Sequence, residues 1–396
     1  MEAGNERCAV MGETFAAWLS ITCLALALAG CVYALGAAVV FRRFVGESAP
    51  PPVTFPGVTI LKPLCGVELG LYHDLASFCD QNYSGPVQIL FGLQDAADAA
   101  IAVVNRLIAE RPGRDLELIL HAPSRGPNPK VANVVGMQHH IRHDVVILAD
   151  ADIAVTPNYL CETITALGLP DVGAITYLYR GAARGGLWAR LASMGIDYHF
   201  LPNVLVGLRL GLARPCFGST IALRRETLAT IGGFDAFLDH IADDYAIGEA
   251  VRATGMKVAI PSVLLAHACF EQSAVELMRH ELRWARSVRA VNPPGYGSSV
   301  ITYPLPFAVL GAALGGFGVL GTSMIAAAIA CRLVLQLQVD HTLQVSPRRW
   351  WLGPARDLLS FAVYVASFFV NIVSWHGRRY KVRADGTMES MGEPKT

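Results

Sequence analysis

Two long runs without a charged residue constrain the fold of this chain more than any other feature of its sequence. The first covers 27 residues, from Phe15 to Phe41, and the second covers 42 residues, from Ala290 to Cys331. A third apolar stretch lies at Leu358–Trp375. About 20 apolar residues in a helix are enough to cross a hydrocarbon core that is roughly 30 Å thick. The chain is therefore expected to span a membrane near both of its ends.

The first run is interpreted as an uncleaved membrane anchor, and a cleaved signal peptide is the alternative. A signal peptide begins with basic residues, whereas the residues before this run are net acidic. These residues are Glu2, Glu6, Arg7 and Glu13. Arg42 and Arg43 follow the run directly. The positive-inside rule therefore predicts that the chain after them is cytoplasmic.

The sequence leaves the number of C-terminal spans open. Within the second run, Gly315-Gly316 fits either a tight-packing point in one helix or the turn of a helical hairpin. Basic residues lie on both sides of Leu358–Trp375. The positive-inside rule then gives conflicting orientations, unless this stretch lies in the membrane interface.

The composition supports a membrane protein and argues against several other classes. Hydrophobic residues make up 53% of the chain and charged residues 16%, against about 25% charged residues in soluble domains. Lys plus Arg and Asp plus Glu balance at 32 each, so no net charge attracts nucleic acid, and no nucleic-acid partner is expected. The nine cysteines have no paired spacing, which indicates free thiols rather than a disulfide framework or a zinc site.

Between the first two runs, apolar segments of strand length alternate with segments of helical character. The strand-length segments are Val58–Leu61, Val87–Leu93, Leu116–Leu120, Val145–Leu148 and Val172–Tyr177. Helices are expected at Ala99–Arg111 and Pro157–Leu167. This alternation predicts an α/β fold with a mostly parallel sheet that is covered on both faces. Ligands bind such sheets beyond the carboxyl ends of the strands.

Two acidic sites follow predicted strands. Asp150-Ala151-Asp152 comes directly after Val145–Ala149, and two carboxylates at this spacing can share a hard cation that also binds a diphosphate. The alternative for this pair is a solvated turn. Asp95 ends an earlier strand, where it could accept hydrogen bonds from a base or ribose, or could cap a helix.

Two further motifs lie on predicted helices. Asp243-Asp244-Tyr245 begins a helix that runs to Ala253, and taken alone it favours a solvated helix N-terminus. In the segment His280 to Trp284, Arg283 could bind a phosphate and Trp284 offers a flat apolar surface beside it. The alternative is a basic amphipathic helix on the membrane surface. No P-loop and no Rossmann dinucleotide motif is present.

The order of these motifs is more specific than any one of them. Asp95, Asp150-x-Asp152, Asp244 and Arg283-Trp284 follow one another and precede the C-terminal apolar run. Other segments complete the pattern: Leu61-Lys62-Pro63-Leu64, Gln94-Asp95, Asn128-Pro129-Lys130, Gly218-Ser219-Thr220 and Gly232-Gly233-Phe234. The chain thereby resembles the inverting GT-A glycosyltransferases, and more closely glycosyltransferase family 21, the ceramide glucosyltransferases and their bacterial relatives. It departs from the family at His280, where Gln or Arg is usual.

The resemblance implies a three-part membrane enzyme of the bacterial inner membrane. Its parts would be an N-terminal transmembrane anchor at residues 1–44, a cytoplasmic GT-A catalytic domain at 45–289, and a C-terminal membrane region with a basic tail at 290–396. The enzyme would transfer a sugar from a UDP-sugar to a lipid hydroxyl in the bilayer. The implied Mg²⁺ or Mn²⁺ ion would be held by Asp152 and Asp150, and Asp244 would be the catalytic base. The implied donor-binding residues are Asp95, Asp150, Lys130, Arg283 and Trp284.

The acceptor is expected to be a hopanoid, with ceramide as the alternative. The segments that carry this expectation are Tyr179-Arg180-Gly181, Asp197–Pro202, Ala213–Gly218 and His280–Arg286. They are similar to the bacterial hopanoid-biosynthesis glycosyltransferases, which implies transfer of N-acetylglucosamine to bacteriohopanetetrol. Three other functions are weighed against this one: a processive polysaccharide synthase, which needs more spans, a retaining transferase, and a non-catalytic membrane scaffold on the same fold.

Overall fold

The computed structural model describes residues 2–44, 52–122, 126–345, 349–369, 372–375, 378–382 and 387–391. The chain forms two compact units. The helical unit contains residues 1–45, 194–213 and 292–369, and the α/β unit contains residues 46–193, 214–291 and 370–396. Residues 194–213 therefore belong to the helical unit, although the sequence alone placed them inside the domain at 45–289.

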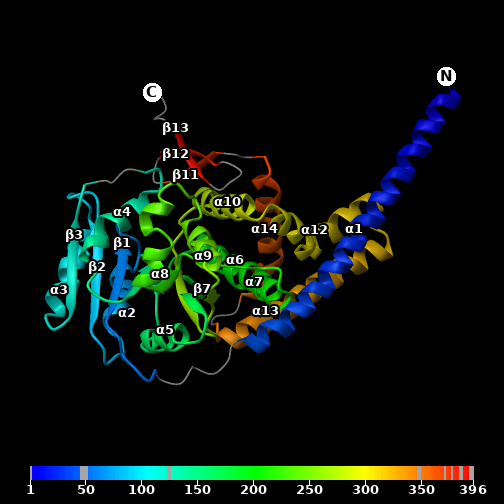
Figure 1. Cartoon of the computed structure of the whole chain (residues 1–396). Coiled ribbons are helices and arrows are strands. Elements are labelled where there is room, and N and C mark those ends of the chain that lie inside the picture. Colours follow the sequence, from blue (N-terminus) through cyan, green and yellow to red (C-terminus); the bar gives the residue numbers. More distant parts are fainter. Residues whose placement is uncertain are drawn as a thin grey trace. The chain divides into compact units, whose positions relative to one another are not determined.

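A seven-stranded sheet forms the centre of the α/β unit, with strand order β3-β2-β1-β4-β8-β6-β9. Its strands β3, β2 and β1 lie side by side in Figure 1. The strands are β1 Val58–Pro63, β2 Val87–Leu93, β3 Asp115–Leu120, β4 Val145–Ala149, β6 Val172–Thr176, β8 Thr220–Arg224 and β9 Lys257–Ala259. Strands β3, β2, β1 and β4 are parallel to one another, and β8 runs antiparallel to both β4 and β6. All five predicted strands are present, and the α/β class is confirmed.

Helices flank this sheet, and their bounds follow the sequence signals closely. They are α2 Leu71–Cys79, α3 Ala100–Glu110, α4 Pro129–Met137, α5 Tyr159–Leu167, α8 Arg225–Thr230 and α9 Asp243–Ala253. The helices expected at Ala99–Arg111 and Pro157–Leu167 are α3 and α5. Strands β1 and β4 are buried along their whole length, as expected for parallel strands that are covered on both faces.

A small second sheet lies in the same unit and is made of β5, β10 and β7. These strands cover Ile153–Ala154, Leu264–Cys269 and Leu178–Ala183. Strand β10 pairs with β5 in antiparallel fashion and with β7 in parallel fashion. Helix α6 (Leu187–Gly195) begins shortly after β7, and helix α10 (Ala274–Val291) follows β10. Because β5 starts directly after Asp152, this sheet fixes the backbone that leaves the Asp150–Asp152 turn.

The helical unit contains two helices that are long and apolar enough to cross a membrane, counted over the described residues. They are Met11–Phe44, within α1 (Glu2–Phe44), and α13 (Val319–Leu343). A third span is formed if the pair Pro293–Thr302 and α12 (Pro304–Leu314), bent by 64°, counts as one. Gly315 and Gly316 lie in the turn between α12 and α13, and Gly316 has a φ of +68°. The hairpin interpretation of this glycine pair is therefore confirmed.

The stretch Leu358–Trp375 does not form one helix. Helix α14 covers Gly353–Ser367, and strand β11 covers Ile372–Trp375 and pairs with β12 (Arg378–Val382), which in turn pairs with β13 (Met388–Met391). A helix of 15 residues is about 22 Å long, which is shorter than a hydrocarbon core of about 30 Å. The conflict over the orientation of this stretch therefore disappears, because its sequence is shared between a short helix and a strand.

The helical unit buries charge and exposes apolar side chains. Arg332 of α13 donates hydrogen bonds to Asp357 of α14 at 2.8 and 2.7 Å, and His199 lies 2.9 Å from the same carboxylate. All three residues are buried, whereas Val319 and Phe369 are more than four-fifths exposed. His199 belongs to a π-helical turn, Ile196–Phe200, that leads into α7 (Leu201–Arg209). Ionisable groups inside and apolar groups outside are typical of membrane-embedded protein.

Candidate active site

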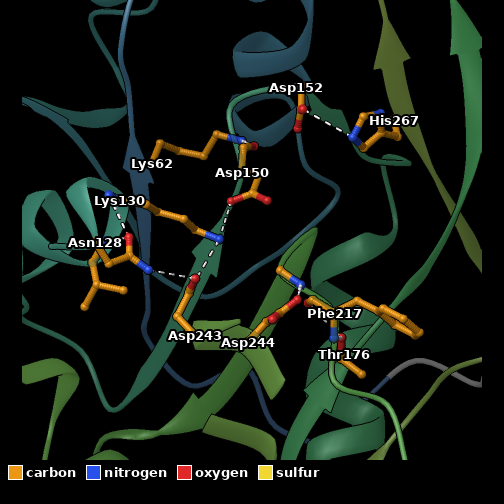
Figure 2. Close-up of polar contacts among 12 residues, drawn as sticks. Lys62, Asn128, Lys130, Asp150, Asp152, Thr176, Phe217, Asp243, Asp244 and His267 are labelled. Atoms are coloured by element: carbon orange, nitrogen blue, oxygen red, sulfur yellow. Dashed lines mark hydrogen bonds and ion pairs between the residues drawn. The ribbon is translucent and has the colours of Figure 1, made fainter. Parts of the chain in front are cut away.

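The Asp150-Ala151-Asp152 segment, here called the acidic turn, connects β4 to β5 at the carboxyl edge of the main sheet. Three hydrogen bonds fix its backbone. The N–H of Asp150 donates to the carbonyl of Ser219 at 3.2 Å, and the N–H of Ala268 donates to the carbonyl of Asp152 at 2.8 Å. The ammonium of Lys62 donates to the carbonyl of Asp150 (Figure 2). The two carboxylates are thereby held where ligands bind α/β sheets.

Lys130 connects the acidic turn to helix α9. Its Nζ lies 2.6 Å from Asp150 Oδ1 and 3.5 Å from Asp243 Oδ2. Burial alone would lower the pKa of Lys130, but the carboxylates of Asp150 and Asp243 raise it above its usual range. Lys130 is placed by Asn128, which caps α4 by accepting hydrogen bonds from the N–H groups of Lys130 and Val131. The predicted residues Lys130 and Asp150 are thus in direct contact.

Asp244 lies in the first turn of α9, the helix that the sequence predicts to run to Ala253. Its Oδ2 accepts a hydrogen bond of 2.7 Å from the N–H of Gly218, and its Oδ1 accepts one of 2.8 Å from the N–H of Tyr245. Burial and the neighbouring Asp243 raise the pKa of Asp244 to about 6, although Lys130 and the two N–H donors lower it. A carboxylate with this pKa is mostly ionised at neutral pH and is able to accept a proton.

Gly218 lies where these groups converge. A Cβ on this residue would be 3.0 Å from Lys130 Nζ, 3.3 Å from Asp244 Oδ2 and 3.4 Å from Asp150 Oδ2. Charged groups from α4, from α9 and from the acidic turn therefore surround one point, and the absence of a side chain at Gly218 keeps that point open. The sequence pattern Gly218-Ser219-Thr220 is explained by this geometry.

His267 is a site residue that the sequence reasoning missed. It lies on β10, and its Nε2 is 3.3 Å from Asp152 Oδ2 (Figure 2). Its ring stacks on Tyr179 with centroids 5.2 Å apart and meets the edge of Trp284 at 5.4 Å. The signal was weak, because a single histidine in the apolar strand Leu264–Cys269 is more often a packed core residue.

Asp152 and His267 have the donor atoms that a divalent cation needs. Asp152 Oδ1 and His267 Nδ1 are buried and have no hydrogen-bond partner among the described residues. Buried polar atoms are nearly always partnered, so Asp152 Oδ1 is available to a ligand. His267 faces Asp152 through Nε2, which is the nitrogen placed to share that ligand. Carboxylate oxygen and imidazole nitrogen both suit Mn²⁺, and Mg²⁺ prefers the carboxylates. Over the described residues, no three His, Cys, Asp or Glu side chains form a ready metal site. A diphosphate and water would have to supply the other ligands.

Helix α10 carries the predicted Arg283 and Trp284. Trp284 packs against His280, with ring centroids 4.5 Å apart, and against Tyr179 at 6.3 Å. Burial lowers the pKa of Arg283, while Asp152 and Asp150 act in the opposite direction. The carboxylates of Asp152 and Asp150 thus favour the charged guanidinium of Arg283.

Asp95 is the one predicted residue that the structure does not connect to the others. It is exposed in the loop after β2, and its Oδ1 accepts a hydrogen bond of 2.8 Å from the N–H of Ala97. It makes no hydrogen bond or ion pair with Asp150, Asp152 or Lys130. This is a local turn and not a helix cap, because the N-cap of α3 is Ala99. Contact of Asp95 with a nucleotide stays a prediction.

Comparison with known proteins supplies a family. Residues 22–388 match the family model described as glycosyl transferase family 21. Ceramide glucosyltransferase 1 of Caenorhabditis elegans is 23% identical over 392 residues, which cover 92% of this chain and 81% of that protein. Ceramide glucosyltransferase 3 of the same organism is 25% identical over 218 residues, which cover 53% of this chain and 45% of that protein. The family match includes residues of both units.

The solved structures that resemble this chain have lower sequence identities to it. The mannosyltransferase PcManGT from Pyrobaculum calidifontis, in complex with GDP-Man and Mn²⁺, is 19% identical with a TM-score of 0.47. The alignment covers 88% of this chain and 99% of that one. Glucosyl-3-phosphoglycerate synthase from Mycobacterium tuberculosis, in complex with Mn²⁺, UDP and phosphoglyceric acid, is 15% identical with a TM-score of 0.39. Here the alignment covers 61% of this chain and 82% of that one.

Proposed function

This chain belongs to glycosyltransferase family 21, and from that premise we propose that it transfers a sugar from a UDP-sugar to the hydroxyl of a membrane lipid with inversion. It is a UDP-sugar-dependent hexosyltransferase with a GT-A catalytic domain. One observation carries the mechanistic proposal. The half-buried carboxylate of Asp244 and the acidic turn both border the open point at Gly218. A base for the acceptor and a binding site for the diphosphate are thereby brought to the same place.

The donor is held by residues around the acidic turn. Asp152 and His267, with Asp150 beside them, would hold the Mg²⁺ or Mn²⁺ ion. When bound, this cation offsets the negative charge that grows on the leaving group. Lys130 and Arg283 add fixed positive charge beside the acidic turn, and charges that are already in place stabilise the negative charge that develops there. Trp284 packs behind His267 and keeps that imidazole in place.

Asp244 acts on the acceptor. As the lipid oxygen bonds to the anomeric carbon, its proton passes to the Asp244 carboxylate, and the bond from that carbon to the diphosphate breaks on the opposite side. The N–H groups of Gly218 and Tyr245 fix both carboxylate oxygens before the acceptor arrives. Proton transfer to such a positioned base contributes typically about 10²- to 10⁴-fold to the rate.

The lipid is a hopanoid and the sugar is N-acetylglucosamine, with glucose transfer to ceramide as the alternative. The segments Tyr179-Arg180-Gly181 and Asp197–Pro202 support the hopanoid, and the names of the two similar nematode proteins support ceramide. The test supplies membranes carrying this protein with both lipids and with both UDP-glucose and UDP-N-acetylglucosamine. We expect N-acetylglucosaminyl hopanoid by mass spectrometry, and none from membranes carrying Asp244→Asn. Glucosylceramide as the only product would reject the hopanoid while leaving the transferase function intact.

The enzyme faces the cytoplasm of a bacterial inner membrane, where UDP-sugars are made. Helix α1 ends with Arg42 and Arg43 in its last turn, and basic residues flank the cytoplasmic ends of spans. An alkaline phosphatase reporter, which is active only outside the cytoplasm, should therefore be inactive when fused after Phe55. A fluorescent protein at the same point should fold and fluoresce. An active phosphatase at this position would overturn the orientation and, with it, the cytosolic supply of donor.

A further inference from the structure

Lys62 is a charged residue that the mechanism above does not use. It lies on β1, between β2 and β4, and its exposed fraction is 0%. Its Nζ lies 3.9 Å from the centroid of the Phe78 ring. Burial of an ammonium in a protein core costs free energy, and a methionine would fill the same volume without that cost. The presence of a fully buried lysine at this position is therefore not explained by packing alone.

The contact of Lys62 with the acidic turn supplies that reason. Of the three hydrogen bonds that fix the backbone of this turn, two join main-chain atoms, through Ser219 and Ala268. The third is made by the ammonium of Lys62 and accepted by the carbonyl of Asp150 (Figure 2). The orientation of this peptide determines where the side chains on either side of it point. Of the backbone groups fixed by these three hydrogen bonds, the carbonyl of Asp150 is the one that a side chain holds.

The neighbouring cations are engaged elsewhere. Lys130 binds the carboxylate of Asp150 rather than its backbone, at 2.6 Å. Asp74, which is also within electrostatic range of Lys62, is paired with Arg184 at 2.7 Å. Burial lowers the pKa of Lys62 to about 8, while Asp150 and Asp152 act to raise it. Lys62 thus binds the backbone of the acidic turn, whereas Lys130 binds the side chain of Asp150.

We propose that Lys62 is a positioning residue of the donor site: it fixes the carbonyl of Asp150 and thereby the direction in which Asp150 and Asp152 face the diphosphate. Its charge also offsets the repulsion between these two carboxylates before the donor and its cation bind. The inference rests on the proposed function, because it concerns the geometry of UDP binding. It gives a physical role to the Leu61-Lys62-Pro63-Leu64 segment, which the reaction itself does not explain.

The test compares Lys62→Met, which removes the hydrogen bond and the charge, with Lys62→Gln, which keeps an N–H donor. Lys257→Met is the matched control, because the side chain of Lys257 is 70% exposed on β9. Calorimetry on the full-length protein in detergent measures the Kd of UDP with Mn²⁺, and circular dichroism measures the melting midpoint. A hydrogen bond to a charged group supports a loss of about 10- to 100-fold in UDP affinity for Lys62→Met. Lys62→Gln should fall between Lys62→Met and wild type.

The melting midpoint separates positioning from folding. Lys62→Met leaves the carbonyl of Asp150 without its donor and should lower the melting midpoint somewhat, whereas Lys62→Gln keeps a donor and should melt within about 3 °C of wild type. Wild-type UDP affinity in Lys62→Met would overturn the inference. So would a loss of affinity that follows a loss of melting midpoint in both variants, or failure of both to fold, because Lys62 would then only support the core. If the wild-type protein itself binds no UDP, the proposed function is wrong, and the inference about Lys62 is rejected with it.

Discussion

Asp244→Asn is expected to lower turnover by at least about 10²-fold and to leave the Kd of UDP near the wild-type value. The asparagine keeps the size of the side chain and an oxygen for the N–H of Gly218, but it cannot accept the acceptor's proton. The base acts only as the new bond forms, so its loss reduces kcat rather than donor binding. Rates of sugar transfer and calorimetric UDP titrations measure the two quantities. A variant that keeps more than about a tenth of the wild-type rate would show that Asp244 is not the base.

Asp243→Asn is the matched control, because it removes the adjacent carboxylate. Asp243 faces Lys130 and Asn128 (Figure 2), whereas Asp244 accepts a hydrogen bond from the N–H of Gly218. Its loss should be milder. The pH profile gives a second check. Because the pKa of Asp244 is raised to about 6, activity should fall as the pH drops through 6 and the base becomes protonated. An acid limb of kcat/KM near pH 4 would contradict this environment for Asp244.

The sequence was most informative where one physical pattern dominates. Parallel strands buried on both faces are largely apolar runs, so β1, β2 and β4 could be read directly. The acidic residues at strand ends could also be located, because the topology of α/β sheets brings these ends to one edge. The sequence did not predict which of these acidic side chains contact one another or a basic residue. Asp95 and Asp150 both follow strands, yet Lys130 binds Asp150 whereas Asp95 closes its own turn with Ala97.

The other differences between the sequence-based expectations and the structure arise from contacts between residues that are far apart in the chain. The reversal of β8 depends on its register with β4 and β6, which no local pattern encodes. His267 becomes a site residue only because β10 pairs with β5, directly after Asp152. Residues 194–213 look like any amphipathic segment of an α/β domain until the partners of His199 are known, and these partners lie about 130 to 160 residues further along the chain.

Asp152→Ala is expected to lower activity at least about 10²-fold, because metal stabilisation of a leaving group contributes several kcal/mol. Asp152 has a buried oxygen without a hydrogen-bond partner in the described part of the chain, and Asp150 is already paired with Lys130. Asp152 is therefore the carboxylate more available to a cation. A chelator should silence the wild type, and added Mn²⁺ should restore it. Asp115→Ala, in an exposed pair with Arg142 on the edge strand β3, is the matched control and should keep full activity.

His267→Ala extends this test to the residue that only the structure identifies. If Asp152 and His267 share one cation, both variants should need more Mn²⁺ for half-maximal activity, and His267→Ala should be the milder because the carboxylates keep most of the opposing charge. If His267 only packs against Tyr179 and Trp284, its loss should lower the melting midpoint without changing the Mn²⁺ requirement. Full wild-type activity in excess chelator would contradict the metal site altogether. Charge stabilisation of the diphosphate would then have to come from Lys130 and Arg283 alone.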